Sequence, residues 1–569
     1  MKLTKLTYLS ITMLVCLSIT SCDLMKDVTY SVAPNPLEMH GDSVAVAVTV
    51  NVPAKGLKKK AKVEITPVLG TSKLDTWTIQ GEKATANGQS IAFKAGGTAT
   101  FEDVIAYDPS MESADLKLTG KIYKGVKEKD ALPETKIADA TVITPLLVQP
   151  AFRMLMAEDK LVRSVQKSVA AEMNYEKGKS DVRANEIKDK DIIDLVAWVV
   201  AAQSNPKIVI NSIDVKGFAS PDGEENKNSS LSIDRSKSGR KAFMDLMKKA
   251  KMMQYADSSK YSVNGLGEDF VGFKDQLART TSISEADKNL FIRILEMSTD
   301  AKQRETEMIN LGKSYTQLDK EVFPKIRRAV ITVNYTENGL TDDELKTASV
   351  SNPNSLTIEE LLFTAANLTK NINEKAAIYA VAATNYPADH RGHNNLGAVR
   401  YIQNMVPDAK KSLETANSIS DNGLTKNNLA GVAMTNGDRA LAKKLLSQVK
   451  DKTTQLAYNN AVISILEGKY SAAISSLGTE ATFNKALAQV LTGKLDEASK
   501  TLAASADKES ADGYYLKAII AARSNAGVDA VVSSLKSAFA KNPDYKSKAG
   551  RDREFIKLMS DASFSAAIN

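Results

Sequence analysis

The C-terminal part of the chain repeats itself, and this recurrence constrains the fold more than any other feature. Asparagine pairs recur in Ala-rich contexts, so that Asn395, Asn428 and Asn460 lie 33 and 32 residues apart. Each pair is followed by a turn and by a second segment with alanine at helical spacing. Units of this length bury an apolar face only by stacking on their neighbours. The repetition therefore predicts an all-α array of helical hairpins over residues 358–569.

These units resemble tetratricopeptide repeats (TPRs), shortened in places. In that family, small residues at the crossings let paired helices approach closely, and the stacked hairpins form a superhelix with a concave groove suited to peptides or partner helices. The resemblance implies that residues 358–569 bind one or more protein partners. A structural cap that packs on the preceding domain is the alternative. His390 and His393 lie near a helix start, but two histidines without a third ligand make a poor zinc site.

The first 22 residues have the order of an export signal. Lys2 and Lys5 precede an apolar stretch over residues 6–19, which is short for a bilayer span. The stretch ends in Ile-Thr-Ser-Cys, with the cysteine at Cys22. This arrangement resembles a bacterial lipoprotein signal, in which the cysteine becomes the lipidated first residue. An ordinary secretory peptide with an incidental cysteine is the alternative.

The lipoprotein resemblance implies a signal peptide over residues 1–21 and acyl chains, such as palmitate, on Cys22. Several acyl chains hold a protein on a membrane far better than one, because each buried methylene contributes about 0.8 kcal/mol. The expected location is the bacterial outer membrane. The acidic run that follows the cysteine in some surface-exported Bacteroidota lipoproteins is absent here, which favours the periplasmic face.

Composition excludes several classes of protein. With 43% hydrophobic and 25% charged residues, the 569-residue chain is globular and long enough for several domains. Its two cysteines, Cys16 and Cys22, leave no disulfide framework, and three histidines exclude a His-rich metal centre. The net charge of +7 is mild, and no basic run stands out beyond residues 58–60. We therefore expect no cofactor, no metal and no nucleic-acid partner.

Residues 22–150 have the pattern of a β-sandwich. Valines 44, 46, 48, 50 and 52 alternate with smaller or polar residues, which predicts a strand with one buried face. Turn residues such as Asn87–Gly88 and Asp108–Pro109 separate further short segments. This domain is expected to be a docking module or a spacer. The other predicted strands are 62–68, 75–79, 90–94, 99–105, 115–123 and 138–144.

Residues 151–336 alternate between strand and helix patterns. A strand over 165–173 precedes a helix over 191–203, and a second strand over 208–218 precedes a helix near Ser230. A last strand is expected at 329–335. This order predicts an α+β domain. A polar stretch with Asn352–Pro353–Asn354 predicts a linker over residues 337–357.

The central region resembles the OmpA-like C-terminal domain. The family's spacing is matched by Gly217, Gly223, Asn228, the pair Leu231–Ser232 and Arg235, and the closing strand by Arg327–Ile331. A helical insertion at about 270–323 and the Ala-Ser-Pro-Asp-Gly loop are similar to Bacteroidota members, whose domains occur in lipoproteins of fimbriae and other envelope assemblies. The resemblance covers about a third of the chain.

The family resemblance implies a site that captures a diaminopimelate-type peptide of peptidoglycan. A helix start and a guanidinium hold its carboxylate, and an aspartate accepts hydrogen bonds from its ammonium group. Arg235 is then the carboxylate clamp, and Asn228 shapes the loop. Ser220 stands where the family has the aspartate, with Asp222 as its substitute. Two alternatives stay open: peptidoglycan binding, or an Arg235 that only tethers the loop.

Together these features predict a multidomain protein with an N-terminal β-sandwich, a central OmpA-like α+β domain and a C-terminal TPR-like superhelix. We find no nucleophile–base pair, metal cluster or cofactor loop, and therefore expect no enzyme and no catalytic residue. The expected function is a lipid-anchored envelope scaffold, an accessory factor of an outer-membrane or surface assembly. The alternative is a simple peptidoglycan tether of the outer membrane.

Overall fold

The computed structural model describes residues 20–21, 24–298 and 300–569. Cys22 and the apolar segment before Thr20 lie outside the described residues. The chain divides into two compact units, of which the first combines residues up to Glu158 with Ala365–Asn569 and the second is Asp159–Thr364. Within the described ranges, no helix is long and apolar enough to cross a membrane.

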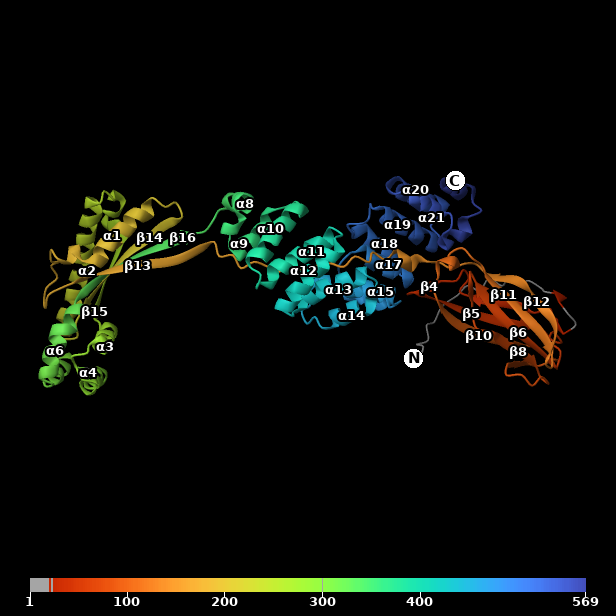
Figure 1. The fold of residues 1–569 in the computed structure, drawn as a ribbon, viewed down its shortest axis with the longest axis horizontal. Helices are drawn as coiled ribbons and strands as arrows, with labels where there is room; N and C mark the ends of the chain where they lie inside the picture. Colours follow the sequence, from red (N-terminus) through yellow and green to blue (C-terminus); the bar gives the residue numbers. More distant parts are fainter. Residues whose placement is uncertain (1–19, 22–23, 299) are drawn as a thin grey trace. The chain divides into compact units, whose positions relative to one another are not determined.

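Two antiparallel-dominated sheets form the N-terminal β-domain of the first unit (Figure 1). The first sheet has the order β10-β5-β3, with β4 on β5. The second has the order β12-β11-β6-β8-β9, with β7 on β6. The strands are β3 Thr29–Ala33, β4 Met39–His40, β5 Ser43–Val52, β6 Ala61–Leu69, β7 Ser72–Lys73, β8 Trp77–Gly81, β9 Gln89–Ile91, β10 Gly97–Ala106, β11 Leu116–Lys124 and β12 Lys127–Ala138. A short pair, β1 Thr20–Ser21 and β2 Met25–Lys26, precedes them.

The valine alternation of β5 faces the shared core of the two sheets. All five of its valines are buried and belong to one cluster with Val63 and Ile65 of β6. Side chains of successive strand residues point to opposite faces, so the smaller residues between the valines face outward. The N-terminal region is therefore sheet-rich, as the alternation predicts.

The last strand of the β-domain differs from the sequence prediction. A strand was expected at 138–144, but β12 ends at Ala138, and Thr144–Leu147 is a 3-10 turn. Most of β12 is exposed on both faces, because it lies at the edge of its sheet. An edge strand in water needs no apolar alternation, and its charged residues also discourage pairing with other chains. For this reason the hydrophobic pattern does not reveal it.

The C-terminal region of the first unit is a series of helical hairpins. Each hairpin has a first helix and a second helix of opposite direction, joined by a short turn. Gly437, Gly468 and Gly493 occupy this turn in three successive hairpins, with φ of 83°, 73° and 77°, a conformation that glycine adopts without strain. The helices are α10 Ile372–Asn385, α11 His390–Ile402 with α12 Val406–Ile419, α13 Gly423–Thr435 with α14 Arg439–Ser447, α15 Thr454–Leu466 with α16 Tyr470–Leu477, α17 Phe483–Leu491 with α18 Leu495–Ala504, α19 Ala511–Arg523 with α20 Val528–Lys541, then α21 Asp544–Ala549 and α22 Ala562–Ile568.

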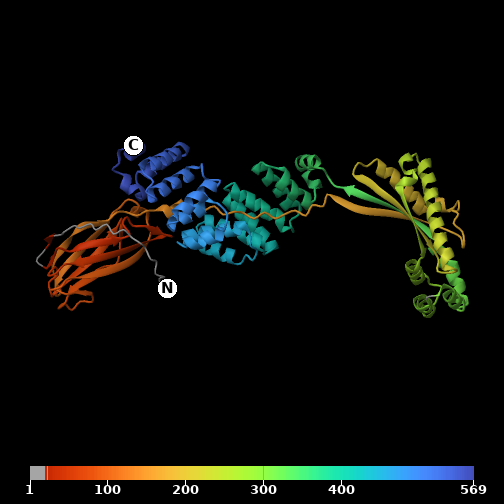
Figure 2. The same cartoon turned by 180° about the vertical axis from the view of Figure 1, so that it is seen from behind.

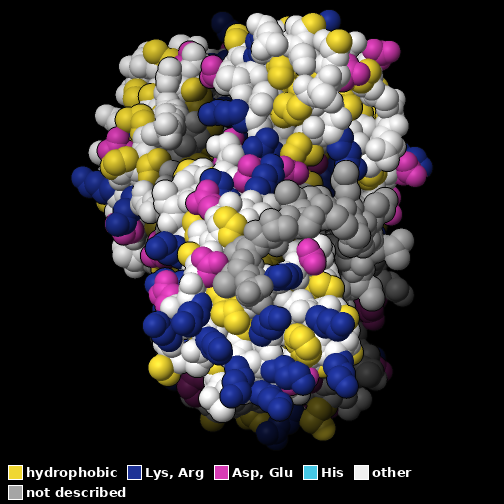
Figure 3. Space-filling view, turned by 90° about the vertical axis from the view of Figure 1, so that its right-hand side faces the viewer, with side chains coloured by type: hydrophobic (Ala, Val, Ile, Leu, Met, Phe, Trp, Pro, Cys, Tyr) yellow, Lys and Arg dark blue, Asp and Glu magenta, His cyan; other side chains and the backbone are white. Residues whose placement is uncertain are grey.

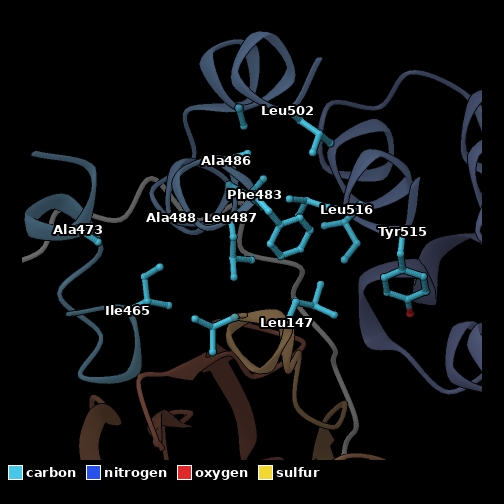
Figure 4. Close-up of a cluster of buried hydrophobic side chains, with 14 of the residues drawn as sticks. Leu147, Ile465, Ala473, Phe483, Ala486, Leu487, Ala488, Leu502, Tyr515 and Leu516 are labelled. Atoms are coloured by element: carbon cyan, nitrogen blue, oxygen red, sulfur yellow. The ribbon is translucent and has the colours of Figure 1, made fainter. Parts of the chain in front are cut away.

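One apolar core joins the hairpins to the end of the β-domain. Leu147 and Val148, which follow the last turn of the β-domain, are buried in the same cluster as residues of α13 to α22. Figure 4 shows Leu147 facing Phe483 and Leu516, which come from α17 and α19. The β-domain and the hairpins are therefore parts of one compact unit.

The second unit is built on a four-stranded mixed sheet of order β13-β16-β14-β15. Its element order is strand, helix, strand, helix, strand, with the closing strand β16 in the middle of the sheet, antiparallel to both neighbours. Gly217 lets helix α2 approach the sheet, since a Cβ there would lie 1.9 Å from the Ser232 carbonyl oxygen. The elements are β13 Ser164–Asn174, α1 Lys190–Gln203, β14 Ile208–Ala219, α2 Glu225–Lys249, β15 Tyr261–Glu268 and β16 Arg328–Asn338.

Five helices separate β15 from β16 and have a core of their own. Phe273, Phe291 and Phe323 are fully buried in that core. The helices are α3 Phe270–Arg279, α4 Glu285–Met297, α5 Ala301–Ile309, α6 Lys313–Glu321 and α7 Phe323–Ile326.

The predicted linker at 337–357 contains regular structure. Helix α8, Asp342–Ser351, begins with a capping box in which Thr341 and Glu344 satisfy each other's backbone N–H groups. Leu345 is its one fully buried residue. A capped but mostly polar helix has a weak apolar pattern, so the sequence pattern does not reveal it. A second helix, α9 Ile358–Phe363, lies just before the boundary of the units at Thr364.

Candidate functional site

An extended segment of the chain itself lies along the first helices of the repeats. We call residues 148–158 the connector, because they follow the β-domain and precede the second unit. In both views of the structure, this segment runs along the hairpins (Figures 1 and 2). The sequence pattern predicts residues 151–158 as part of the central domain, but the division into compact units places them with the repeats.

Four asparagines each hold one connector residue by both backbone groups. In each case the side-chain oxygen accepts from the residue's N–H, and the side-chain NH₂ donates to its carbonyl. The pairs, with N–H and carbonyl distances, are Asn395 with Ala157 at 2.7 and 2.9 Å, Asn428 with Leu155 at 2.7 and 2.7 Å, Asn459 with Arg153 at 2.7 and 3.0 Å, and Asn484 with Gln149 at 2.9 and 2.9 Å.

Two further asparagines brace this row. Asn394 donates to the Leu155 carbonyl at 3.0 Å and accepts from Asn428 at 2.9 Å. Asn427 donates to the Arg153 carbonyl at 3.0 Å and accepts from Asn459 at 2.9 Å. We call these six residues the asparagine ladder. All six side chains are buried. Water therefore cannot replace a hydrogen bond that one of them loses.

The ladder forms hydrogen bonds to the main chain of an extended segment. Its partners at 153, 155 and 157 are alternate residues, and alternate residues of a strand present their backbone groups to the same side. The first helices α11, α13, α15 and α17 each supply at least one ladder residue. Recognition of backbone groups depends little on the identity of the side chains, so this surface suits extended polypeptide in general.

Side chains of the connector add specific contacts. Phe152 is buried in the repeat core, and its N–H donates to the Tyr401 hydroxyl at 3.2 Å. Arg153 pairs with Glu480 at 2.6 Å and lies 3.9 Å from the centroid of the Tyr458 ring. These contacts favour the chain's own segment over an arbitrary strand.

The repeated spacing located this site only in part. Asn395 and Asn428 belong to the ladder, but the third asparagine of the pattern, Asn460, does not. Its NH₂ donates to the Leu456 carbonyl of the same helix at 3.0 Å. The neighbouring Asn459 takes the place in the ladder, because it is the one on the helix face toward the connector. A sequence that shows asparagine pairs does not tell which member faces inward.

A second set of contacts joins the C-terminal helices to the β-domain within the first unit. Glu554 accepts from the Arg523 Nε at 2.8 Å and Nη2 at 2.6 Å, and it also accepts from the Thr144 hydroxyl. The Tyr470 hydroxyl lies 3.0 Å from the Gly41 nitrogen, and its ring packs edge-on against His40. Burial lowers the pKa of His40, so its neutral form is favoured at this contact.

Asp552 is a buried carboxyl in the same region. Burial, with the negative charge of Glu554, raises the pKa of Asp552 to about 6. The Tyr515 hydroxyl donates to it at 2.7 Å, and it caps the following turn by accepting from the Glu554 N–H at 3.0 Å.

In the second unit, the predicted clamp Arg235 is buried rather than open. Its side chain is 1% exposed. The Nε donates to the Lys179 carbonyl at 3.0 Å, Nη1 to Phe218 at 2.9 Å and Nη2 to Glu176 at 3.2 Å. Burial, together with the charge of Arg327, lowers the pKa of Arg235 to about 10. In this structure the guanidinium ties loops of the protein together, which is the alternative role left open for it.

The other predicted residues do meet at one place. Ser220 donates to Asp222, and Asn228 donates to the carbonyls of Ser220 and Asp222 at 3.2 and 3.0 Å. Asp222 is buried and pairs with Lys177 at 3.0 Å and Arg327 at 3.2 Å. Burial raises the pKa of Asp222, but the Ser220 hydrogen bond and the two cations lower it more, and the net pKa lies below the ordinary value.

Sequence reasoning placed Arg327 in the closing strand and missed its part in this cluster. Its Nε donates to the Ser220 hydroxyl at 3.1 Å, and its Nη2 also pairs with Asp319 of the helical insertion at 2.9 Å. The cluster of Ser220, Asp222, Asn228 and Arg327 thus satisfies its own charges and hydrogen bonds. Nothing short of a structure could show this, since residues 220 and 327 are brought together only by the sheet.

In the described part of the chain, no group of three or more His, Cys, Asp or Glu side chains is arranged to hold a metal ion. The asparagine ladder binds the backbone of an extended segment. The cluster of Ser220, Asp222, Asn228 and Arg327 pairs buried charges within the protein.

Comparison with known proteins gives distant structural likeness. The sequence matches no protein-family model and no curated protein. Among solved structures it is similar to YrrB, a TPR protein with an unusual peptide-binding site, at TM-score 0.20 and 18% identity, over 36% of this chain and 95% of YrrB. It is also similar to the Cut9–Hcn1 hetero-tetramer of APC/C at TM-score 0.32 and 13% identity, over 67% of this chain and 82% of that one. The assignment of a helical repeat region rests on the hairpins themselves.

Proposed function

We propose that this protein is a non-enzymatic scaffold of the bacterial cell envelope. In this proposal, acyl chains on Cys22 anchor it to the outer membrane at the periplasmic face, and it serves as an accessory factor of an outer-membrane or surface assembly. The support for the anchor is the order of residues 1–22. The support for a scaffold is the asparagine ladder, which is the observation that carries the proposal.

The ladder holds the chain's own connector, and this favours a scaffold over a peptide receptor. Four two-point backbone contacts, with Phe152 buried beside them, fix the β-domain and the repeats as one unit. A tethered segment also competes at a high effective concentration, in the millimolar range for short linkers. A free peptide would have to displace these contacts and also compete with the high effective concentration of the tethered connector. We therefore expect protein partners to bind repeat surfaces that the connector leaves open.

A crosslinking pull-down of the native protein from solubilised envelopes tests the scaffold function. The expected result is a reproducible membrane complex, recovered equally with Asn459→Ala and with the matched control Asn460→Ala. Recovery of muropeptides alone would support the peptidoglycan tether instead. Loss of the partner in Asn459→Ala alone would show that partner binding depends on the ladder, contrary to the expectation that the partner binds elsewhere on the repeats.

The anchor has a separate test. Mass spectrometry of the mature native protein should show a chain that begins at Cys22 and carries acyl groups. A chain with a free thiol at this residue, or one that keeps residues 1–21, would contradict the anchor but not the scaffold.

Peptidoglycan binding has weaker support from the geometry. In the described residues, the Arg235 guanidinium faces backbone carbonyls and Asp222 is paired with two cations. A diaminopimelate-type ligand would need both groups to leave these partners. Sacculi are therefore expected not to retain the full chain, and retention that Arg235→Ala abolishes would restore the tether hypothesis.

A further inference from the structure

A group of lysines lies at one tip of the β-domain, and the proposed function does not use it. A shallow hollow of about 500 Å³ opens at this tip, between the start of β6 and the end of β11. Leu24 and Phe93 form part of its wall. Figure 3 views the β-domain from this end and shows lysine and arginine side chains gathered on the visible face. We call the five lysines that line the hollow the basic tip: Lys58, Lys59, Lys60, Lys83 and Lys124.

The fold brings these lysines together from three parts of the chain. Lys58, Lys59 and Lys60 are consecutive. The Lys83 N–H donates to the Lys59 carbonyl at 2.7 Å, which holds the segment after β8 beside them. Lys124 ends β11, where it is paired with Ala61 in the register of β11 and β6. The sequence shows only the run of three.

Most of this charge is not neutralised by the protein. Lys59 pairs with Glu82 at 3.1 Å. Lys58, Lys60, Lys83 and Lys124 are exposed, and none of them has an ion pair within the described residues. Lys58 and Lys59 also lie within 5.9 and 5.5 Å of the Phe93 ring centroid. Like charges held this close repel one another, and an external anionic surface relieves the repulsion.

Leu24, the first described residue after Cys22, also lies at this tip. The Leu24 carbonyl accepts from the Lys58 N–H at 3.0 Å, so Leu24 is fixed beside the lysines. Cys22 lies two positions before Leu24, with Asp23 between them, and two fully extended residues span at most about 7 Å. The chain length therefore keeps the Cα of Cys22 within about 7 Å of the Cα of Leu24, a separation shorter than the Debye length of about 10 Å at 0.1 M salt.

We propose that the basic tip binds the phosphates of anionic phospholipids at the membrane surface. The orientation rests on the proposed anchor at Cys22, and the binding itself rests on the lysines. Acyl chains combined with a basic patch form a two-part attachment of the kind that gives stable membrane binding. The second part orients the β-domain with its tip toward the bilayer. Each lysine near an anionic surface is worth about fivefold in partition.

Vesicle binding of an unlipidated chain tests this proposal without the anchor. Residues 23–569 lack Cys22 and are mixed with vesicles of equal parts phosphatidylcholine and phosphatidylglycerol, or of phosphatidylcholine alone. Cosedimentation is expected only with phosphatidylglycerol and should weaken as salt is added. Lys58→Gln with Lys60→Gln and Lys124→Gln should lower the partition about a hundredfold.

A charge-matched control removes three exposed lysines elsewhere in the first unit: Lys73→Gln, Lys411→Gln and Lys444→Gln. It should bind as the parent does. An equal loss in both variants, or equal binding to both kinds of vesicle, would overturn the proposal. So would binding to an oligonucleotide with the same lysine dependence but none to anionic vesicles. An unmodified Cys22 in the native protein would defeat the anchor and leave the vesicle result standing.

Discussion

At the scale of single residues, the asparagine amide is the group that defines this protein. One amide side chain supplies an acceptor and a donor at the spacing of a peptide's N–H and carbonyl. Six such side chains, buried in a row, satisfy the connector and one another. A hydrophobic residue in place of Asn395, Asn428, Asn459 or Asn484 would leave a buried backbone N–H of the connector without its partner.

Replacement of one ladder residue should loosen the connector locally. Asn459→Ala removes both bonds to Arg153 and the bond to Asn427. The Arg153 carbonyl keeps its bond from Asn427, but the Arg153 N–H and the Asn427 side-chain oxygen are left unpaired, at a cost of about 2–4 kcal/mol. Hydrogen exchange of the amides at 149–157 should accelerate by at least about 30-fold. Asn460→Ala loses only a bond within its own helix and should leave that exchange unchanged. Equal acceleration in the two variants would contradict the ladder.

The raised pKa of Asp552 predicts a specific pH dependence. Its folded pKa of about 6 exceeds the ordinary value, so the folded state holds the proton more tightly. Stability from this group is therefore full below the unfolded pKa and falls as pH rises toward 6, by on the order of 2–3 kcal/mol. The Asp552→Asn side chain does not titrate, so the stability of this variant should lack the pH-dependent contribution. The difference in unfolding free energy between wild type and Asp552→Asn, measured from pH 4 to pH 7, should shift in favour of the variant, and a flat difference would disprove the raised pKa.

At the scale of elements, the connector behaves as an added strand whose partners are side chains. Ordinary strands pair with the backbone of another strand, whereas this one pairs with amides projected from four helices. The helices are positioned by small residues at their crossings. A Cβ on Gly392, for example, would lie 2.8 Å from the Ala383 nitrogen of the preceding helix, so α11 approaches α10 at a distance that only glycine permits there.

A proline scan of the connector separates backbone recognition from side-chain recognition. Leu155→Pro removes the N–H that Asn428 accepts at 2.7 Å, whereas Met156→Pro removes an N–H for which no bond exists in the described structure. The chain is cut at a protease site inserted after Glu158. The fragment that ends there should stay bound to the rest in the parent and in Met156→Pro, and dissociate at least about tenfold faster in Leu155→Pro. Equal dissociation of the two variants would argue against main-chain recognition.

At the scale of the whole molecule, the two compact units each have their own core. Each also has one tryptophan, since Trp77 lies in the β-domain and Trp198 in α1 of the second unit. Separate cores allow separate unfolding transitions. The protein is thus expected to have two midpoints in denaturant rather than one.

Single-tryptophan variants test this expectation. Trp198→Phe leaves Trp77 to report on the first unit, and Trp77→Phe leaves Trp198 to report on the second. Asn459→Ala should lower the midpoint seen by Trp77 and leave the midpoint seen by Trp198 within error. A shift of both by the same amount would show that the units unfold as one.

The periodicity of the residues specifies the classes of structure in this chain. Alternating valines specified a half-buried strand, and recurring Ala-rich units specified stacked helical hairpins, because both patterns follow from the period of local structure. The three-dimensional packing sets which groups fill the sites. It placed residues 148–158 on the ladder, chose Asn459 over Asn460, buried Arg235 against carbonyls, and joined Lys83 and Lys124 to the lysine run. These outcomes depend on contacts between residues far apart in the chain, and local periodicity carries no information about such contacts.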